Sequence, residues 1–463
     1  MMKFGYRARG MAGATAVAAA AILASGCDVK QELLAPQQPG VISPTDVTNA
    51  TAANALYTGA IGRWKAAMNG GGNNTEALWN WEALFTDELR SGDTFVERNN
   101  ADQRNLATNQ GVLTPIYRAT AQSRGRMRQA IDALLTYDTS PTGTQRVGEL
   151  YYAMGYVEMI MSQAFCNGIP FGETVDGVPQ YGQPLPTSEG SKLAIAHFDT
   201  ALKYLNGTDA SSVNVKNAVL VAKARAQADL ADFAGAAATV ASVPTEFQYN
   251  FDFSQPTFDN EWWVMGPNVK RYNAGDSTDI AGPILNAIPF ARLNDPRVKV
   301  TNTGDKAEDN TSAFMRVDNW DRDDPVPVAS GIDARLIEAE AKLQANDIAG
   351  MMSILNALRS KPQVLGIFKV AAMAPLATPA TKDAAIDLFF REKALWQFGR
   401  GYRMDDLRRL VRQYKRTQDK VFPTGNFTRN GTPSGQFGTQ VAFPVPDDEK
   451  INPNFHGCLD TNA

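Results

Sequence analysis

A repeated helical hairpin is the feature that most constrains how this chain can fold. Residues 216–231 form an Ala-rich stretch with the character of a helix, and a turn at Ala231-Asp232-Phe233 leads into a shorter helix over 232–242. Alanine favours helix, and its small side chain lets a partner helix approach closely. The pattern therefore predicts a closely packed pair of helices.

The same layout recurs nearer the C-terminus. Apolar residues fall at i, i+4, i+7 and i+11, a turn at Asn346-Asp347 follows, and a second apolar stripe completes the hairpin. The two stripes are Ile332, Leu336, Ala339 and Leu343, then Ile348, Met351, Leu355 and Leu358. Repeated helix pairs stack to bury a shared core, as tetratricopeptide units do. The strict tetratricopeptide consensus is absent, so we predict tetratricopeptide-like pairs.

The rest of the chain divides into helical and irregular stretches. Further helices are predicted over 46–68, 115–135, 147–165 and 188–205. Residues 244–330 and 421–463 are instead rich in turn-forming residues, which predicts long loops with a few short strands. The expected fold class is therefore all-α dominated, with tetratricopeptide-like helix pairs, long irregular loops and few strands.

The N-terminus has the three-part layout of a secretory signal peptide. Lys3, Arg7 and Arg9 precede an apolar run that ends in small residues before Cys27. The stretch resembles a bacterial lipobox, with Ala24 where leucine is usual. It predicts a signal peptide over 1–26, lipidation of Cys27, a flexible tether over 27–45 and a folded body over 46–463. An ordinary signal peptide with an incidental cysteine is the alternative.

The charge balance of the mature chain disfavours nucleic acid as a partner. The chain has 45 basic and 49 acidic side chains, and the leader removes three basic and no acidic ones, which leaves a net charge of −7. No basic stripe is present, so nucleic-acid binding is not expected.

Two cysteines remain after Cys27. Exported proteins fold where disulfides persist, and the remaining number is even. We predict that Cys166 and Cys458 form a disulfide that ties the C-terminal tail to the helical body. Two free buried thiols are the alternative.

Six segments, taken in order, resemble the SusD/RagB family of nutrient-binding lipoproteins of the outer membrane. They are the Tyr-containing helix and Gly-x-Pro loop of 149–173, the hairpins of 215–237 and 332–360, the Asp-Pro-Arg sequence of 294–298, the Arg-Glu…Asp-Leu-Arg segment of 391–410 and the Pro-Val-Pro…Asn-Pro-Asn segment of 443–454. Each motif alone is weak, and their order behind a lipobox gives the resemblance its weight.

The resemblance implies four tetratricopeptide-like helix pairs and a ligand site built from loops. It also implies a lipid-anchored place at the outer membrane, on the cell surface, beside a SusC-like TonB-dependent channel. The ligand would be an oligosaccharide or a peptide. A helical-repeat lipoprotein that acts only as an assembly scaffold is the alternative.

The 391–409 segment allows two interpretations. It ends its helix at Gly399 and Gly401 and then presents guanidinium and carboxylate groups from Arg403, Asp405, Asp406, Arg408 and Arg409. Structural ion pairs that hold the C-terminal helix to the body are the first interpretation. A binding site for an acidic ligand is the second.

Two aromatic-rich regions are predicted to hold the ligand. A flat ring covers the apolar face of a sugar, while Asp, Asn or Arg bonds its hydroxyls. The candidates are Trp79, Trp81, Asp93 and Phe95 in the first region, and Trp262, Trp263, Tyr272, Asn319 and Trp320 in the second. Core packing and docking to a partner protein are the alternatives for these aromatic residues.

Signatures of catalysis and metal binding are missing from the sequence. His197 and His456 are the two histidines, and neither has a partner at the spacing of a zinc site. There is no Gly-x-Ser-x-Gly elbow and no phosphate-binding loop. We therefore expect a binding protein without metal or cofactor, and not an enzyme.

Overall fold

The computed structural model describes residues 47–70, 76–175 and 178–463. The signal peptide, Cys27 and the tether lie outside the described residues. Residues Asn49–Ala463 form one compact unit. The helices are α3 (Ala50–Asn69), α4 (Leu78–Phe85), α5 (Val96–Asp102), α6 (Leu113–Tyr137), α7 (Pro141–Ala164), α8 (Thr187–Tyr204), α9 (Ala210–Asp229), α10 (Phe233–Val240), α11 (Glu261–Trp263), the π-helix η2 (Val264–Asn268), α12 (Gly331–Gln344), α13 (Ile348–Arg359), α14 (Lys382–Trp396), α15 (Arg403–Arg412) and the 3-10 turns η3 (Gln418–Lys420) and η4 (Asp447–Ile451).

The strands are short. They are β1 (Leu89–Ser91), β2 (Ile169–Pro170), β3 (Glu173–Val175), β4 (Val178–Gln180), β5 (Pro184–Leu185), β6 (Gln248–Phe251), β7 (Tyr272–Ala274), β8 (Thr278–Asp279), β9 (Gly282–Leu285), β10 (Val300–Lys306), β11 (Ala313–Val317), β12 (Val326–Ser330), β13 (Gln363–Leu365), β14 (Phe368–Val370), β15 (Thr424–Arg429) and β16 (Thr432–Gln436). The largest sheet in the described part of the chain is four-stranded, with the order β16-β15-β9-β8.

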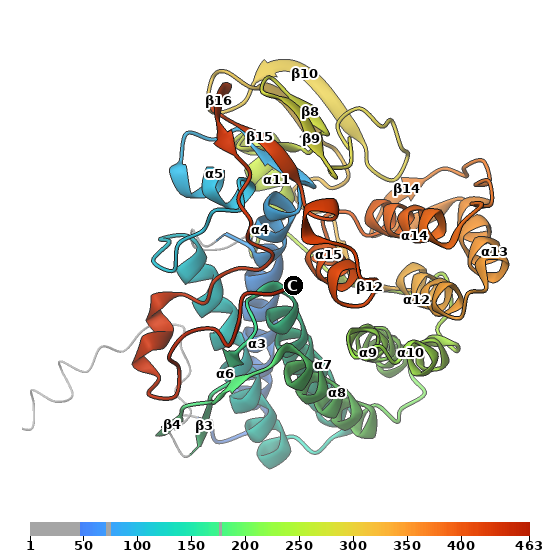
Figure 1. Cartoon of the computed structure of the whole chain (residues 1–463). Helices are drawn as coiled ribbons and strands as arrows, with labels where there is room; N and C mark the ends of the chain where they lie inside the picture. Colours follow the sequence, from blue (N-terminus) through green and yellow to red (C-terminus); the bar gives the residue numbers. More distant parts are fainter. Residues whose placement is uncertain (1–46, 71–75, 176–177) are drawn as a thin grey trace, which may run out of the picture. The chain divides into compact units, whose positions relative to one another are not determined.

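Four helix pairs form the helical scaffold of the unit. α3 packs on α6, α7 on α8, α9 on α10 and α12 on α13, and α6–α7, α8–α9 and α10–α12 contacts join one pair to the next. In Figure 1 the pairs follow one another from blue through green to orange. The predicted fold class is confirmed: helix pairs carry long irregular loops and short strands.

The two predicted hairpins share the same turn chemistry. Ala231 and Asn346 each adopt a positive φ of 61°. The aspartate that follows each of them caps the next helix, because its side chain accepts a hydrogen bond from the backbone N–H of a glycine three residues on. These turns are Asp232-Phe233-Ala234-Gly235 and Asp347-Ile348-Ala349-Gly350. A Cβ atom on either glycine would lie 2.0 or 2.3 Å from the capping carboxylate, which explains why glycine stands there.

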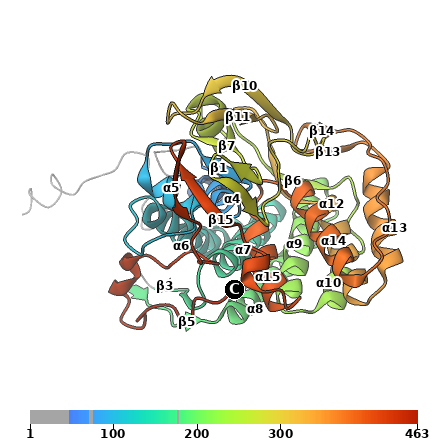
Figure 2. The same ribbon diagram turned by 45° about the horizontal axis from the view of Figure 1, so that its top comes forward.

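A group of strands and their loops gathers at one end of the unit. β8, β9, β10, β15 and β16 lie together with α5 at the top of Figure 1, away from α8 and α10, and Figure 2 shows β10 and β11 in the same region when the view is turned. We call this region the strand-rich end. Both predicted ligand regions contribute to it or to the helices beneath it.

Buried ion pairs attach α14 and α15 to the helix pairs. Arg400 pairs with Asp333 of α12 at 2.6 Å, Arg409 pairs with Glu340 of the same helix, and Lys393 pairs with Asp406 at 2.5 Å. The side chains of all six are at most 6% exposed. Removing one member of such a buried pair leaves the other charge unpaired and destabilises the folded protein by about 3–5 kcal/mol. The structure thus confirms the structural interpretation for these pairs.

The predicted cysteine pair is joined in the structure. Cys166 and Cys458 form a disulfide with their Cα atoms 6.0 Å apart. Beside it, the Asn167 side chain donates to Asp460 at 2.7 Å. These bonds fix the C-terminal tail to the end of α7.

No helix within the described ranges is long and apolar enough to cross a membrane.

Candidate functional site

The predicted ligand aromatics divide by exposure. Phe95 is 47% exposed and Trp263 is half-buried. The other five are at most 5% exposed and lie in the core: Trp79, Trp81, Trp262, Tyr272 and Trp320. Of the seven predicted ligand aromatics, only Phe95 and Trp263 therefore present a ring surface that an external ligand can reach in this structure.

Two of the buried tryptophans cover the turn after α14. Gly399 and Gly401 have positive φ values of 69° and 68°. A Cβ on Gly399 would lie 2.2 Å from the ring of Trp262, and one on Gly401 would lie 2.4 Å from the ring of Trp79. Each tryptophan ring occupies the space that a side chain on the glycine would need, which explains the Gly-x-Gly sequence. The same packing holds α15 in position.

Two other buried aromatics support a charged cluster. The Trp81 indole N–H donates to Glu76 at 2.8 Å, and the Tyr272 hydroxyl donates to the same carboxylate oxygen. The other oxygen of Glu76 accepts from Arg98 Nη2 at 2.6 Å. Trp81 and Tyr272 thus position Arg98 through Glu76, and direct contact of either ring with a ligand stays a prediction.

Arg98 supports the exposed ring of Phe95. The guanidinium lies 5.1 Å from the ring centroid, and its Nη1 donates to Asp93 at 2.6 Å. Asp93 also accepts from the Phe95 backbone N–H at 2.8 Å and from Arg271 at 3.1 Å. We call Phe95, Arg98 and Asp93 the Phe95 platform. Burial opposes ionisation of Asp93, but the Phe95 N–H and the two guanidiniums outweigh it, so the pKa of Asp93 lies below its ordinary value.

A second platform repeats this arrangement. The Arg322 guanidinium lies 5.0 Å from the centroid of Trp263, and its Nε donates to Asp259 at 2.7 Å. Asn260 caps α11 by accepting from the Trp262 backbone N–H, which fixes the start of this short helix. We call Trp263, Arg322 and Asp259 the Trp263 platform. In both platforms an aromatic ring, a guanidinium and a carboxylate lie in series, and together they offer an apolar face and hydrogen-bonding groups.

Asn319 and Trp320 are placed by the loop around them. Asn319 donates to the Arg297 carbonyl at 2.8 Å and accepts from the Lys299 N–H at 2.9 Å. The Trp320 ring lies 5.5 Å from that of Trp262. Both side chains tie the 294–298 turn and its surroundings together, and their contact with a ligand stays a prediction.

Of the charged groups around the two rings, the sequence indicates only Asp93. The roles of Glu76, Arg98, Asp259 and Arg322 are not predicted from it. Arg98 had a local signal, since it follows Phe95 by three residues at the start of a helix and so shares its face. Arg322 lies far from Trp263 in sequence, and only the tertiary fold brings the two together.

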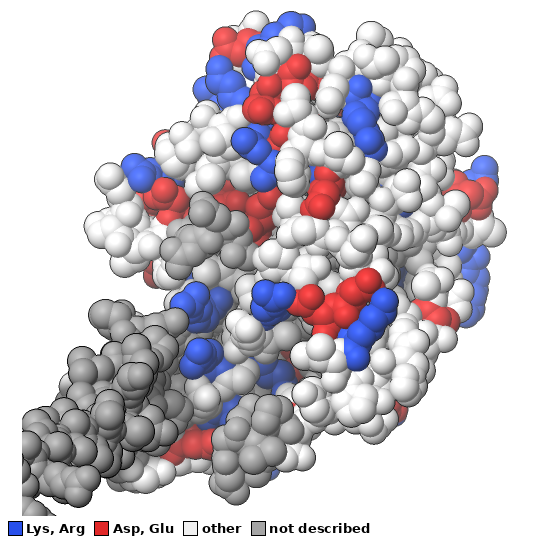
Figure 3. Space-filling model, turned by 90° about the vertical axis from the view of Figure 1, so that its left-hand side faces the viewer, with Lys and Arg blue, Asp and Glu red and all other residues white. Residues whose placement is uncertain are grey.

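The left-hand side of the molecule as drawn in Figure 1 carries charges of both signs. Figure 3 shows the face that includes α5, where blue and red side chains intermingle and do not form one continuous patch of a single sign. Within the described ranges no group of three or more His, Cys, Asp or Glu side chains is placed to hold a metal ion.

Comparison with solved structures identifies the fold. The chain is similar to a SusD-like carbohydrate binding protein from Bacteroides vulgatus, with a TM-score of 0.63, 13% identity and coverage of 88% of this chain and 97% of that one. Surface glycan-binding protein A from Bacteroides uniformis gives 0.62 at 12% identity over 88% and 99% of the two chains. A SusD-like protein from Bacteroides fragilis gives 0.62 at 13% over 90% and 98%. No protein-family model and no curated protein matches the sequence. The predicted resemblance is confirmed at the level of the fold.

Proposed function

Starting from this SusD-like fold, we propose that the protein is a non-catalytic glycan-binding lipoprotein. It captures an oligosaccharide outside the cell, is held at the outer membrane by the lipid on Cys27, and delivers the ligand to a SusC-like TonB-dependent channel. The observation that carries the proposal is the likeness to the two carbohydrate-binding structures over nearly the whole of their length. A peptide remains the second ligand class to test.

The two platforms support a sugar as the ligand. Each presents one accessible ring beside a guanidinium and a carboxylate. A ring of this kind stacks on the C–H face of a pyranose, and the partly exposed groups beside it, Arg98, Arg322 and Asp259, can bond its hydroxyls, whereas Asp93 is buried and holds Arg98 in place. Loops on a rigid scaffold are where ligand-contacting residues are usually displayed.

Titration of the mature protein against a glycan and peptide panel tests the proposal. For any glycan that binds, Phe95→Ala or Trp263→Ala should weaken affinity about tenfold, because a stacked aromatic ring contributes about 1–1.5 kcal/mol to binding. Tyr137→Ala is the matched control, since Tyr137 is 41% exposed and belongs to neither platform. Binding that all three variants leave unchanged would remove the platforms as the site.

The delivery step is tested separately by affinity purification of the tagged protein from native membranes. A large outer-membrane β-barrel should co-purify. If it does so while no glycan or peptide binds, the protein is an assembly scaffold. If no such channel co-purifies, the delivery step is wrong.

A further inference from the structure

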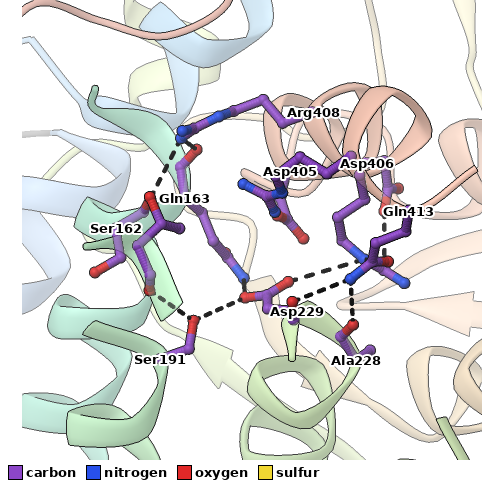
Figure 4. A network of polar contacts seen from close by, with 12 residues as sticks. Ser162, Gln163, Ser191, Ala228, Asp229, Asp405, Asp406, Arg408 and Gln413 are labelled. Atoms are coloured by element: carbon purple, nitrogen blue, oxygen red, sulfur yellow. Dashed lines mark hydrogen bonds and ion pairs between the residues drawn. The ribbon is translucent and has the colours of Figure 1, made fainter. Parts of the chain in front are cut away.

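A polar pocket lies away from both platforms, where α7, α8, α9 and α15 meet. It has a volume of about 300 Å³ and shares no lining residue with the platforms. Its lining includes Arg408, Arg412, Asp229 and Asp460, together with Asn167, Thr187 and Ser188, which we call the rim. Figure 4 shows the contacts of two of these residues: Arg408 extends from α15 toward Ser162 and Gln163, and Asp229 faces Gln163 from the other side.

Arg408 brings a buried positive charge to this pocket without a carboxylate partner. It is 1% exposed, and its Nη1 donates to the carbonyls of Gln163 at 2.6 Å and Phe165 at 2.9 Å. Its Nε has no acceptor in the described part of the chain. Arg400 and Arg409, which are equally buried in the same segment, each face a carboxylate instead. Burial, together with the charge of Arg412, lowers the pKa of Arg408 to about 9, so a bound anion would relieve an unfavourable site.

Arg412 adds a second cationic group. Its Nη2 lies 3.5 Å from Asp405, and its Nη1 is buried without an acceptor among the described residues. Asp229 and Asp405 lie side by side. Burial and the neighbouring Asp405 raise the pKa of Asp229, while nearby guanidiniums hold the pKa of Asp405 below its ordinary value, so the pair carries one negative charge. Asp460 also lines the pocket, and its pKa is lowered by hydrogen bonds from the Asn167 side chain and the Asn462 N–H.

The rim adds hydroxyl and amide groups. Thr187 and Ser188 stand in the first turn of α8, an 18-residue helix whose N-terminal end favours a negative charge. Asn167 accepts from the Thr187 N–H at 2.8 Å, so the rim is anchored to the end of α7. The two guanidiniums and the hydroxyls that line this pocket match a small molecule that has one carboxylate and several hydroxyl groups.

We propose that this pocket binds a monosaccharide-sized sugar acid, with its carboxylate between Arg408 and Arg412 and its hydroxyls at the α8 rim. The volume is at the lower end of small-molecule sites and suits one sugar ring. The inference rests on residues that the proposed glycan site does not use, so either can fail alone.

Calorimetric titration of the mature protein tests the pocket. Sodium D-glucuronate should bind, and D-glucose, which lacks the carboxylate, should bind at least tenfold more weakly. Arg412→Gln should weaken glucuronate binding tenfold or more, because charge-assisted hydrogen bonds of this kind dominate such sites. Arg416→Gln is the matched control, since Arg416 lies just past the end of α15 and its ion pairs among the described residues are with exposed Asp383 and Asp387. Equal binding of glucose and glucuronate, or an unchanged Arg412→Gln variant, overturns the proposal.

A second measurement uses no Arg408 variant, because Arg408 also bonds the carbonyls at the end of α7 and its loss would disturb the fold. In the unmodified protein, the NMR signal of the Arg408 Nε–H should shift on glucuronate addition and not on glucose addition. The Phe95→Ala/Trp263→Ala double variant should bind glucuronate normally. Loss of glucuronate binding in that variant would assign the ligand to the platforms and contradict the pocket. Acetate, which has a carboxylate but no hydroxyls, should raise the melting temperature less than glucuronate does. An equal rise with the two ligands would contradict the role of the rim.

Discussion

Single residues decide which aromatic side chains remain available to a ligand. Trp79 and Trp262 look like ligand residues in the sequence, yet each fills the space left by a glycine far along the chain. No local pattern contains that information, because it depends on where α15 and its preceding turn come to lie. Phe95 and Trp263 are the candidate rings that keep exposed surface, and their exposure is equally a result of tertiary structure.

Glu82 of α4 provides a pH test at the residue scale. It is 2% exposed, its Oε1 has no partner in the described structure, and burial raises its pKa to about 8. In the unfolded chain a glutamate titrates near 4.3. The folded state therefore holds a proton that the unfolded state releases, and this contribution to stability is lost as pH rises from about 4.5 through 8.

Glu82→Gln mimics the protonated form and should remove this loss. At pH 7.5 the free energy of unfolding of the variant should exceed that of the unmodified protein by on the order of 2–4 kcal/mol, with the difference shrinking toward pH 4.5. Chemical denaturation across that range measures it. Asp383→Asn, at an exposed position, serves as the control and should change little. A difference that does not vary with pH would contradict the assignment.

At the scale of elements, helix pairs were the most predictable part of the fold. Their apolar stripes are local, so the predicted hairpins agree with α10, α12 and α13 within a few residues, while the prediction for α9 begins six residues late. For the region 244–330 the sequence predicts only a few short strands. Two of its pairings are local hairpins, β8 with β9 and β10 with β11, but others join segments far apart: β6 with β12 and β1 with β7. Sequence periodicity does not encode such long-range partners.

The shared hairpin turn gives a second prediction. Gly350→Ala alone should destabilise the protein, because the new Cβ would lie 2.3 Å from the Asp347 carboxylate. Asp347→Ala alone removes a helix cap and should destabilise by about 1 kcal/mol. The double variant should be no less stable than Asp347→Ala, because alanine suits the freed helical position. Thermal or urea denaturation of all four proteins completes the cycle, and simple additivity of the two single effects would count against this account of the turn.

At the scale of the whole molecule, the disulfide joins residues 292 positions apart. Its presence followed from the number of cysteines and the export signal, with no knowledge of the fold. The chain-entropy model predicts that closing so long a loop stabilises by up to about 5 kcal/mol, and typical disulfides reach about 2–4 kcal/mol. Cys166→Ala/Cys458→Ala should lower the free energy of unfolding by an amount in that range, measured by urea denaturation. The unmodified protein in reductant should match the variant, and equal stability of oxidised and reduced protein would contradict a stabilising bridge.

The same bridge makes the main chain between Cys166 and Cys458 part of a covalent ring. A protease that cuts one exposed loop inside this ring, such as the β8–β9 hairpin that carries Ile280 at 71% exposure, opens the ring without dividing the molecule. The C-terminal fragment stays bonded to the fragment that begins at the N-terminus. A protein exposed to extracellular peptidases would thus survive a first nick with both fragments still attached, and a nicked sample should run as one band until it is reduced.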